Sequence, residues 1–273
     1  SLCHWGVQDT LKRLNGMFAF SLWDDAEKTL TLARDRMGEK PMYYGSVGNT
    51  FFFGSELSSF KPHPSWAGAI NRDVVSLYLR HNYVPDPWSI YSGIQKLAPA
   101  HYVVISNDGK NVSEQIPYWS LLKIIESRSQ IDEKRPDDFI EAFNELLKDA
   151  IRKRLVSDVP LGALLSGGID SSLVVSLMQE VSPEPVKTFT IGFYEEGYNE
   201  AEYAKKIAEH LGTEHTEMYV SSEEARDTIV RLPQIWDEPF ADSSQIPTLI
   251  VSELTRQNVS VGLSGDGGDE LFC

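Results

Sequence analysis

Apolar residues form short, nearly continuous runs in the first 119 residues of the chain, and short polar segments separate them. A charged segment joins the run at 16–24 to the run at 29–36, and two runs rich in Tyr and Phe flank the turn at 46–50. Paired runs of this kind are typical of β-hairpins. Near-continuous apolarity also predicts strands that are covered on both faces, as in a sandwich.

Two further patterns complete this first half. Asn71 is a favourable N-cap residue type and precedes a helical pattern that extends to residue 82. The Asn-Asp-Gly-Lys segment at 107–110 separates two more apolar runs and predicts another hairpin. After Trp119 the sequence becomes polar and charged, so we expect a first domain at 1–120, a linker at 121–135 and a second domain at 136–273.

The second domain alternates between helix and strand patterns. Apolar residues at helical spacing cover 136–156, and a strand at 159–165 precedes a helix at 169–180. Strands separated by helices require a parallel sheet with helices on its faces. Ligands bind beyond the carboxyl ends of the strands in such sheets. The remaining expected strands are 185–193, 214–220 and the run before residue 264, and the remaining expected helices are 199–211, 223–232 and 245–257.

The segment SGGIDSS begins at Ser166, between a strand and a helix. Gly167 and Gly168 can take backbone angles denied to other residues and let phosphate oxygens approach the amides. The helix N-terminus adds N–H donors and a partial positive charge. Asp170 would repel a phosphate, which predicts a Mg²⁺ ion between the two. The hydroxyl donors of this loop are Ser166, Ser171 and Ser172. The alternative is a tight glycine-rich turn without a ligand.

A second segment of the same type, SGDGGDE, follows the last expected strand and contains Asp266, Asp269 and Glu270. Two glycine-rich acidic loops at the same edge of one parallel sheet predict the two walls of a nucleotide and metal site. No lysine follows the glycines, so neither loop has the usual P-loop pattern.

Charge and length limit the partners. The chain of 273 residues has 40 acidic and 25 basic side chains and a net charge of −15 at pH 7. This balance argues against a protein that binds the phosphate backbone of nucleic acids, although a loop and a metal ion can bind one nucleotide in an acidic protein. No apolar run approaches the length of a membrane span. We therefore expect a cytoplasmic protein with no nucleic-acid or membrane partner.

The two loops resemble those of a known family. LLSGGIDSS and LSGDGGDELF are similar to the signature loops of the glutamine-hydrolysing asparagine synthetase B family, and SGGxDS alone resembles the pyrophosphate loop of the wider class of ATP pyrophosphatases. LNGMFAFSLWD and VPDPWSIYSGIQKLAPAHYVV resemble the same family, in the same order. The chain has no initiator Met, so we expect a fragment lacking both ends, with the family's cysteine nucleophile upstream.

The resemblance implies a fold and a reaction. The first domain would be part of a class II glutamine amidotransferase domain, which is an N-terminal-nucleophile αββα sandwich. The second would be the N-terminal portion of a parallel-sheet ATP-pyrophosphatase domain. ATP would adenylate the side-chain carboxylate of aspartate, and ammonia, added or released from glutamine, would displace AMP to give asparagine. ATP and Mg²⁺ are the implied cofactors, and a homodimer is a candidate assembly.

Individual site residues carry over from the family pattern. Leu164 and Ile191 match positions that line the adenosine, and Ser264 and Gly265 match a second contact to the adenylate. Residues that match the pyrophosphate loop are Ser166, Gly167, Gly168, Asp170, Ser171 and Ser172.

The acidic positions carry further roles. Asp170 and Asp269 match the metal-binding acids. Asp266 matches a catalytic acid that promotes formation of the aspartyl adenylate, and many members have Glu there. Asn15 stands where other members have an Asp that binds the amino group of glutamine, so it is a candidate glutamine-binding residue.

Several alternatives stay open. A tRNA-modifying pyrophosphatase and a non-catalytic scaffold are the other classes of function, and the acceptor is either aspartate or a carboxylate of a polysaccharide or peptide. Arg34 and Asp35 are expected to form a structural pair. Three further acids are Asp237, Glu238 and Asp242. They either help to bind the amine of the substrate or have a surface or capping role.

Overall fold

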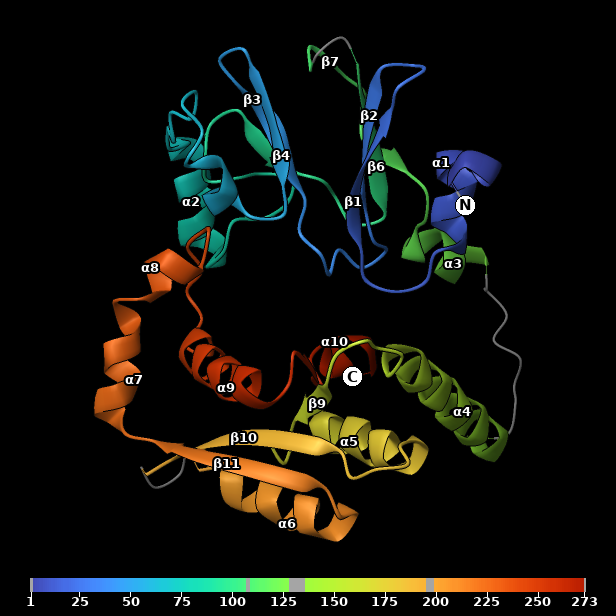
Figure 1. Ribbon diagram of the computed structural model, residues 1–273, viewed down its shortest axis with the longest axis vertical. Helices are drawn as coiled ribbons and strands as arrows, with labels where there is room; N and C mark the ends of the chain where they lie inside the picture. Colours follow the sequence, from blue (N-terminus) through green and yellow to red (C-terminus); the bar gives the residue numbers. More distant parts are fainter. Residues whose placement is uncertain (1, 107–108, 128–135, 195–198, 273) are drawn as a thin grey trace. The chain divides into compact units, whose positions relative to one another are not determined.

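The computed structural model describes residues 2–106, 109–127, 136–194 and 199–272. The chain divides into two compact units (Figure 1). One unit contains residues 1–131 and 233–241, and the other contains residues 132–232 and 242–273. Within the described residues, no helix is both long enough and apolar enough to cross a membrane.

The first unit contains two antiparallel sheets (Figure 1). The first sheet has the order β1 (Ala19–Asp24), β2 (Thr29–Arg34), β6 (His101–Ser106) and β7 (Asn111–Val112), and β8 (Ile116–Pro117) also pairs with β6. The second has the order β4 (Thr50–Gly54), β3 (Tyr43–Val47) and β5 (Ile94–Lys96). The expected hairpins β1–β2 and β3–β4 are confirmed. The third is confirmed by the pairing of β6 with β7, while residues 107–108 of its turn lie outside the described residues.

One apolar cluster packs residues of both sheets together, which makes this unit a sandwich. Leu32 and Val103 come from the first sheet and Tyr44 from the second, and all three are almost completely buried. The expectation that every strand is covered on both faces was wrong, because Trp23 of β1 is 54% exposed and Phe53 of β4 is 41% exposed. Each of these strands therefore presents one face to solvent within its own sheet.

Short helices complete the first unit. Asn71 is confirmed as the N-cap of α2, because its side chain accepts hydrogen bonds from the amides of Asp73 and Val74. The helices and the 3₁₀ helix of this unit are α1 (Leu2–Arg13), η1 (Leu57–Phe60), α2 (Arg72–His81) and α3 (Leu121–Ser127). α3 occupies the start of the expected linker, of which residues 128–135 lie outside the described residues.

The second unit contains a parallel four-stranded sheet (Figure 1). Its order is β11 (Glu214–Val220), β10 (Lys187–Phe193), β9 (Leu161–Leu164) and β12 (Val261–Leu263), and each neighbouring pair is parallel. The chain moves from β9 outward to β11 and then returns to the other side of β9. The order of strands therefore reverses between β9 and β12, and this is the place where α/β sheets bind ligands.

Helices cover both faces of this sheet. α6 contacts β10 and β11, while α9 contacts β10 and β12 from the opposite face (Figure 1). Gly212 ends α6 in a left-handed conformation with φ 71°, as expected from the sequence. The helices of this unit are α4 (Pro136–Arg154), α5 (Ile169–Val181), α6 (Ala201–Leu211), α7 (Ser222–Ile229), α9 (Gln245–Asn258) and α10 (Gly268–Phe272).

The single helix expected at 223–232 was wrong. α7 ends at Ile229, and a separate short helix, α8 (Leu232–Ile235), follows. Pro233 disfavours helical angles at the residue before it and lacks the N–H that a continuous helix needs. The break coincides with the point where the chain leaves the second unit for residues 233–241 of the first.

Candidate nucleotide site

Two glycine-rich loops follow the adjacent parallel strands β9 and β12. The pairing Leu161↔Val261 and Ala163↔Leu263 sets the strands in register, so both loops start at the same edge of the sheet. The first loop leads into α5 and the second into α10. This is the arrangement that the sequence predicted for the two segments.

The two loops touch each other, and glycine makes the contact possible. A Cβ atom at Gly265 would lie 2.6 Å from the backbone N of Ser171, and a Cβ at Gly268 would lie 2.4 Å from Oδ2 of Asp170. Real Cβ contacts are essentially never shorter than 3.0 Å. The glycines of the second loop therefore let its backbone lie against the first turn of α5 and against the carboxylate of Asp170.

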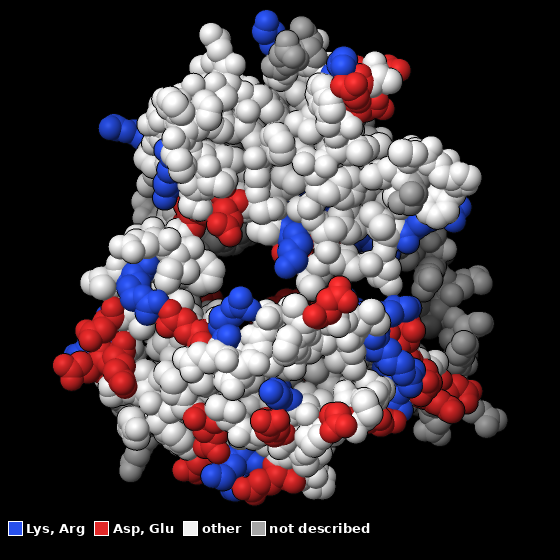
Figure 2. Space-filling view, viewed as in Figure 1, with Lys and Arg blue, Asp and Glu red and all other residues white. Residues whose placement is uncertain are grey.

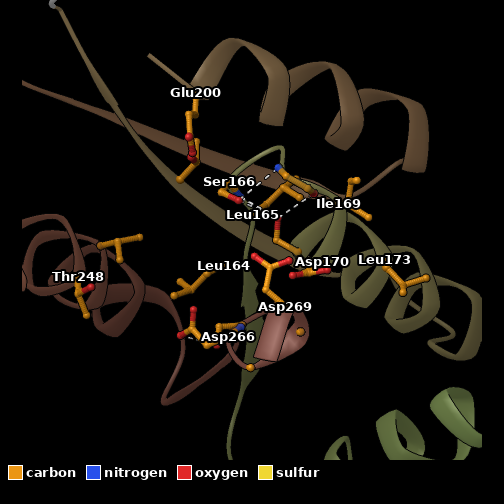
Figure 3. A pocket seen from close by; sticks show the side chains of 18 of the residues that line it. Leu164, Leu165, Ser166, Ile169, Asp170, Leu173, Glu200, Thr248, Asp266 and Asp269 are labelled. Carbon is orange, nitrogen blue, oxygen red and sulfur yellow. Dashed lines mark hydrogen bonds between the residues drawn. The ribbon is translucent and has the colours of Figure 1, made fainter. Parts of the chain in front are cut away.

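Hydroxyl groups shape the first loop. The Ser171 side chain is buried, and its Oγ lies 2.9 Å from Oγ of Ser166 and accepts a hydrogen bond from the Ser166 amide at 3.2 Å. The Ser172 hydroxyl donates to the Gly168 carbonyl at 2.6 Å. These internal bonds, drawn in part in Figure 3, fix the turn between β9 and α5. In the ligand-free protein, the hydroxyls thus have a structural role in addition to any contact with phosphate.

Gly167 lets α6 approach this loop. Its φ is +86°, a conformation that side chains rarely adopt, and a Cβ there would lie 2.9 Å from Cβ of Tyr203 and 3.0 Å from the amide N of Ala204. The start of α6 therefore packs directly on the loop. The loop is bounded by α6 on one side and by the loop after β12 on another.

A cavity of about 1500 Å³ opens between the two loops, within the second unit. This volume exceeds the usual range of about 300–1000 Å³ for a small-molecule site, so a nucleotide and a second substrate both fit. Gly167 and Ser172 do not line it. Ten of the residues expected in the site do: Leu164, Ser166, Gly168, Asp170, Ser171, Ile191, Ser264, Gly265, Asp266 and Asp269.

Apolar residues form one wall of the cavity. Leu164 and Ile191 pack against a buried cluster that contains Phe189 of β10 and Leu254 of α9. The sheet and α9 therefore hold both side chains in place. An apolar, uncharged wall of this kind suits an adenine ring.

Five carboxylates line the cavity, and three of them are the aspartates of the two loops, Asp170, Asp266 and Asp269 (Figure 3); the others are Glu200 and Glu270. Asp170 comes from the first turn of α5 and Asp269 from the start of α10. Asp266 lies in the second loop and accepts a hydrogen bond from the Ser264 hydroxyl at 3.0 Å. Among the described residues, no group of three or more Asp, Glu, His or Cys side chains forms a complete metal cage. Two hard oxygen donors beside a glycine-rich loop nevertheless fit Mg²⁺, which usually takes one or two carboxylates and completes its shell with phosphates and water.

Sequence reasoning missed three polar residues of this cavity, one of which is Thr190 of β10. Glu200 precedes α6 and Thr248 lies in the second turn of α9, and both line the cavity (Figure 3). Glu200 comes a few residues after the carboxyl end of β10, and that position was the available signal. Nothing in the local sequence around Thr248 indicates that the first turns of α9 face the site.

Other candidate residues lie elsewhere. Asn15 is exposed in the segment between α1 and β1 of the first unit. Asp242 accepts a hydrogen bond from the Ser244 amide at 2.7 Å, which lowers the pKa of its carboxyl, and it caps the turn before α9. Asp237 and Glu238 bind groups of the first unit. These three acids do not line the cavity described above, so the capping role is confirmed for Asp237 and Asp242.

The expected pair of Arg34 and Asp35 was wrong. Arg34 donates to the carbonyls of Gly38 and Leu97 and forms an ion pair with Asp86 at 3.4 Å. Asp35 is completely buried and accepts hydrogen bonds from backbone amides instead. These amides belong to Phe18, Met37, Glu39 and Lys40.

Charged side chains are mixed on the surface. On the face shown in Figure 2, Lys and Arg are scattered among Asp and Glu, and acidic side chains gather over α7. This view shows no stripe of basic residues over the described part of the chain. The distribution agrees with the acidic balance of the sequence.

Two family models match the chain. A model described as asparagine synthase matches residues 142–273, and a model described as glutamine amidotransferase domain matches residues 1–119. A putative glutamine-hydrolyzing asparagine synthetase 2 from Methanocaldococcus jannaschii is 39% identical over 97% of this chain and 50% of its own length. Glutamine-hydrolyzing asparagine synthetase 1 from Bacillus subtilis is 32% identical over 97% of this chain and 40% of its own length.

Two further similarities are more distant. A protein named amidase chry2 from Gibberella zeae is 29% identical over 98% of this chain and 41% of its own length. A solved glutamine-dependent NAD⁺ synthetase from Acinetobacter baumannii aligns over 97% of this chain and 63% of its own, with a TM-score of 0.39 and 14% identity. The second likeness is too remote to carry an argument.

A parallel sheet with paired acidic loops at its switch point, joined in one chain to an antiparallel sandwich, defines the class. It is a synthetase domain of the ATP-pyrophosphatase type combined with a glutamine amidotransferase domain. Within that class, the chain belongs to the asparagine synthetase B family, the glutamine-hydrolysing asparagine synthetases. It spans about half the length of the curated relatives it matches.

Proposed function

We propose that this protein is an ATP-dependent amide ligase that converts aspartate to asparagine, with glutamine or ammonia as the nitrogen source. One observation carries the proposal: contact between the two glycine-rich loops brings Asp170, Asp266 and Asp269 to a single cavity large enough for a nucleotide and an acceptor. Family membership and the names of the relatives support the same reaction.

The first step is acyl activation. An oxygen of the aspartate side-chain carboxylate attacks the α-phosphorus of ATP, and the new P–O bond forms as the bond to pyrophosphate breaks. The product is aspartyl-AMP, whose leaving group is far better than the oxide of a free carboxylate. The backbone amides of the first loop and the N-terminus of α5 would bind the pyrophosphate. Leu164 and Ile191 would hold the adenosine against the apolar wall.

The acidic residues have separate roles in this proposal. Asp170 and Asp269 would hold Mg²⁺, which neutralises phosphate charge when it is bound. The absence of a side chain at Gly268 leaves room for the carboxylate of Asp170, because a Cβ atom there would lie 2.4 Å from its Oδ2. Asp266 promotes formation of the adenylate, and the hydroxyl of Ser264 orients its carboxylate.

The second step forms the amide. The nitrogen lone pair of ammonia attacks the acyl carbon of aspartyl-AMP, a C–N bond forms, and AMP leaves with the electron pair of the C–O bond. The nitrogen then loses a proton. Ammonia would come from glutamine in the first unit, where Asn15 is the candidate residue for binding the glutamine amino group. A neutral amide there accepts a hydrogen bond without an ion pair.

Isotope exchange in the full-length protein tests the role of Asp266. Labelled pyrophosphate should enter ATP only when aspartate is present, and Asp266→Ala should reduce this exchange by about 10²-fold or more, as loss of an electrostatic group does at other active sites. Asp266→Glu should retain exchange because it keeps the charge. Asp158→Asn, an exposed acid of the same unit, is the matched control. Normal exchange in Asp266→Ala would remove this residue from the mechanism.

The same assay identifies the acceptor. A relative named amidase matches most of the chain, so similarity over this region extends beyond proteins named asparagine synthetase. Exchange that depends on another carboxylate, such as one of a polysaccharide or peptide, and not on aspartate would establish the alternative acceptor. The domain boundaries at 120 and 136, a homodimeric assembly, a cytoplasmic location and the absence of a nucleic-acid partner stay predictions.

A further inference from the structure

Nine residues of the synthetase region pack with the other unit. Residues 233–241 lie within the part of the sequence that matches the asparagine synthase model, yet they belong to the compact unit formed by the sandwich. The chain leaves the second unit after Leu232 and returns to it at Asp242. This excursion contains the two acids whose role the sequence left open, Asp237 and Glu238.

Asp237 caps a helix of the sandwich unit. Its two carboxylate oxygens accept hydrogen bonds from the amides of Leu57 at 2.5 Å and Ser58 at 2.8 Å, at the start of η1. The local N-cap residue, Glu56, makes no side-chain capping bond. A residue about 180 positions away therefore supplies the cap. Hydrogen bonds from amides to a carboxylate are about twice as strong as neutral ones.

Glu238 uses both of its oxygens. One accepts a hydrogen bond from the Ile90 amide at 2.7 Å. The other forms an ion pair with Nζ of Lys96 at 2.8 Å and accepts a bond from the Tyr43 hydroxyl at 3.4 Å. The side chains of Lys96 and Glu238 are only 14% and 10% exposed, and Lys96 also donates to the carbonyl of Val84. Burial and the nearby negative charge of Glu238 raise the pKa of Tyr43, so the phenol stays a donor.

These contacts leave no free carboxylate oxygen for a substrate. Each oxygen of Asp237 and Glu238 already has a partner in the first unit. A buried ion pair with additional hydrogen bonds is expensive to break, because the remaining charge is left without a partner. We therefore call Asp237, Glu238 and their partners Tyr43, Leu57, Ser58, Ile90 and Lys96 the anchor.

The chain leads from the anchor directly into α9, which forms a wall of the cavity. The amide of Ala241 donates to the carbonyl of Asn82 at 2.6 Å, and α9 starts four residues later, at Gln245. Pro247, Thr248 and Val251 of α9 line the nucleotide cavity. The contacts of the anchor are made to β3, to β5, to η1 and to the loop before β5. A shift of that sheet would therefore move the point at which the chain enters α9.

We propose that Asp237 and Glu238 are positioning residues that couple the sandwich to the wall of the nucleotide cavity formed by α9. This inference rests on the proposed function, because it assigns to the anchor the coupling between glutamine hydrolysis in one unit and adenylation in the other. The link runs through the covalent chain from the anchor to α9. Loss of the ion pair uncouples the two activities.

The experiment uses the full-length protein and three variants: Glu238→Gln, Lys96→Met and the double variant. Glutamate released and AMP formed are measured with glutamine, and AMP formation is also measured with added ammonia. We expect the ratio of glutamate to AMP with glutamine to rise about fivefold or more in Glu238→Gln, the lower end of typical coupling between sites. AMP formation with ammonia should change by less. Glu209→Gln, an exposed acid on α6, is the control and should match the wild type.

The double variant separates coupling from stability. Glu238→Gln alone leaves the charge of Lys96 buried without its partner, so the Tm of this variant should fall. The double variant also lacks the Lys96 charge, so its Tm should return toward that of the wild type. The ratio of glutamate to AMP should stay high in the double variant. A ratio that returns to the wild-type value together with the Tm would show that the anchor only stabilises the fold, and an unchanged ratio in Glu238→Gln would also overturn the proposal.

Hydrogen exchange gives a readout that does not depend on the reaction. In Glu238→Gln, peptides covering 236–248 should exchange faster, and the control variant should not change them. Unchanged exchange over 242–248 would contradict the link to α9 even if the ratio changed. A wild-type protein that forms no AMP with ammonia would refute the proposed function, while the exchange experiment would still decide whether the anchor positions α9.

Discussion

Gly268→Ala should impair adenylation by moving a single carboxylate. The new Cβ would lie 2.4 Å from Oδ2 and 2.5 Å from Cγ of Asp170, whereas ordinary contact begins at 3.4 Å. Asp170 must therefore retreat by about 1 Å, or the second loop must move away from α5 by the same amount. No backbone strain contributes, because Gly268 does not have a positive φ.

The size of the effect follows from that displacement. A misplacement of about 1 Å at a reactive site can cost roughly 10²-fold in rate. We expect the exchange of pyrophosphate into ATP to fall by about that factor, and the affinity for ATP with Mg²⁺ to weaken, since Asp170 is a proposed metal ligand. Higher Mg²⁺ should restore part of the activity if the ligand is displaced rather than lost.

Matched glycine variants provide the control. Gly262 lies in the edge strand β12 that leads into the second loop, and the Cβ of Gly262→Ala would meet only Thr255 Cγ2 at 3.3 Å and Leu164 Cδ2 at 3.9 Å. It should therefore retain exchange close to that of the wild type. Calorimetry would measure ATP binding in both variants with and without Mg²⁺. Equal ATP affinity and equal exchange in Gly268→Ala would refute the argument that contact between the two loops positions Asp170.

Two other changes test groups outside the cavity. Asp35→Asn should lower the free energy of unfolding, measured in urea, by roughly 3–5 kcal/mol. An NH₂ group would replace the oxygen that accepts hydrogen bonds from the amides of Phe18 and Lys40, and bonds to charged groups contribute about 1.5–3 kcal/mol each. A loss below about 1 kcal/mol would contradict this reasoning. Burial lowers the pKa of His215, so the folded state favours the neutral ring and stability should decline as pH falls below about 6.5. His215→Gln should flatten the urea midpoint between pH 7 and pH 5, and an unchanged slope would count against a role for this ring.

Local sequence patterns predicted most of the second unit because each pattern has a local cause. The alternation of strand and helix patterns placed β9, β10 and β11, and Gly212 ended α6 as a residue that accepts a left-handed conformation. The two loops were predictable for a related reason. Only glycine allows the approaches at 167, 265 and 268, so the fold's requirement is visible as a residue type.

Features that depend on distant partners could not be predicted in this way. Asp35 was expected to pair with its neighbour Arg34, but both side chains turn to backbone groups brought near by the strand ends. Asp237 caps a helix about 180 residues earlier, and no local signal identifies that helix. Thr248 enters the cavity because α9 packs on β10 and β12, which a helical pattern alone does not reveal.

The carboxylates illustrate why residue type alone leaves function open. Asp35, Asp170 and Asp237 are all aspartates beside tight turns, but backbone amides satisfy both oxygens of the first and the last. Such an acid already accepts hydrogen bonds from the backbone on each oxygen and stabilises the fold. Asp170 instead lines a cavity, and its carboxylate lies so close to Gly268 that any side chain at position 268 would clash with it. A carboxylate that lines a cavity beside a second acidic loop can bind a cation, and that difference separates the candidate site from the scaffold.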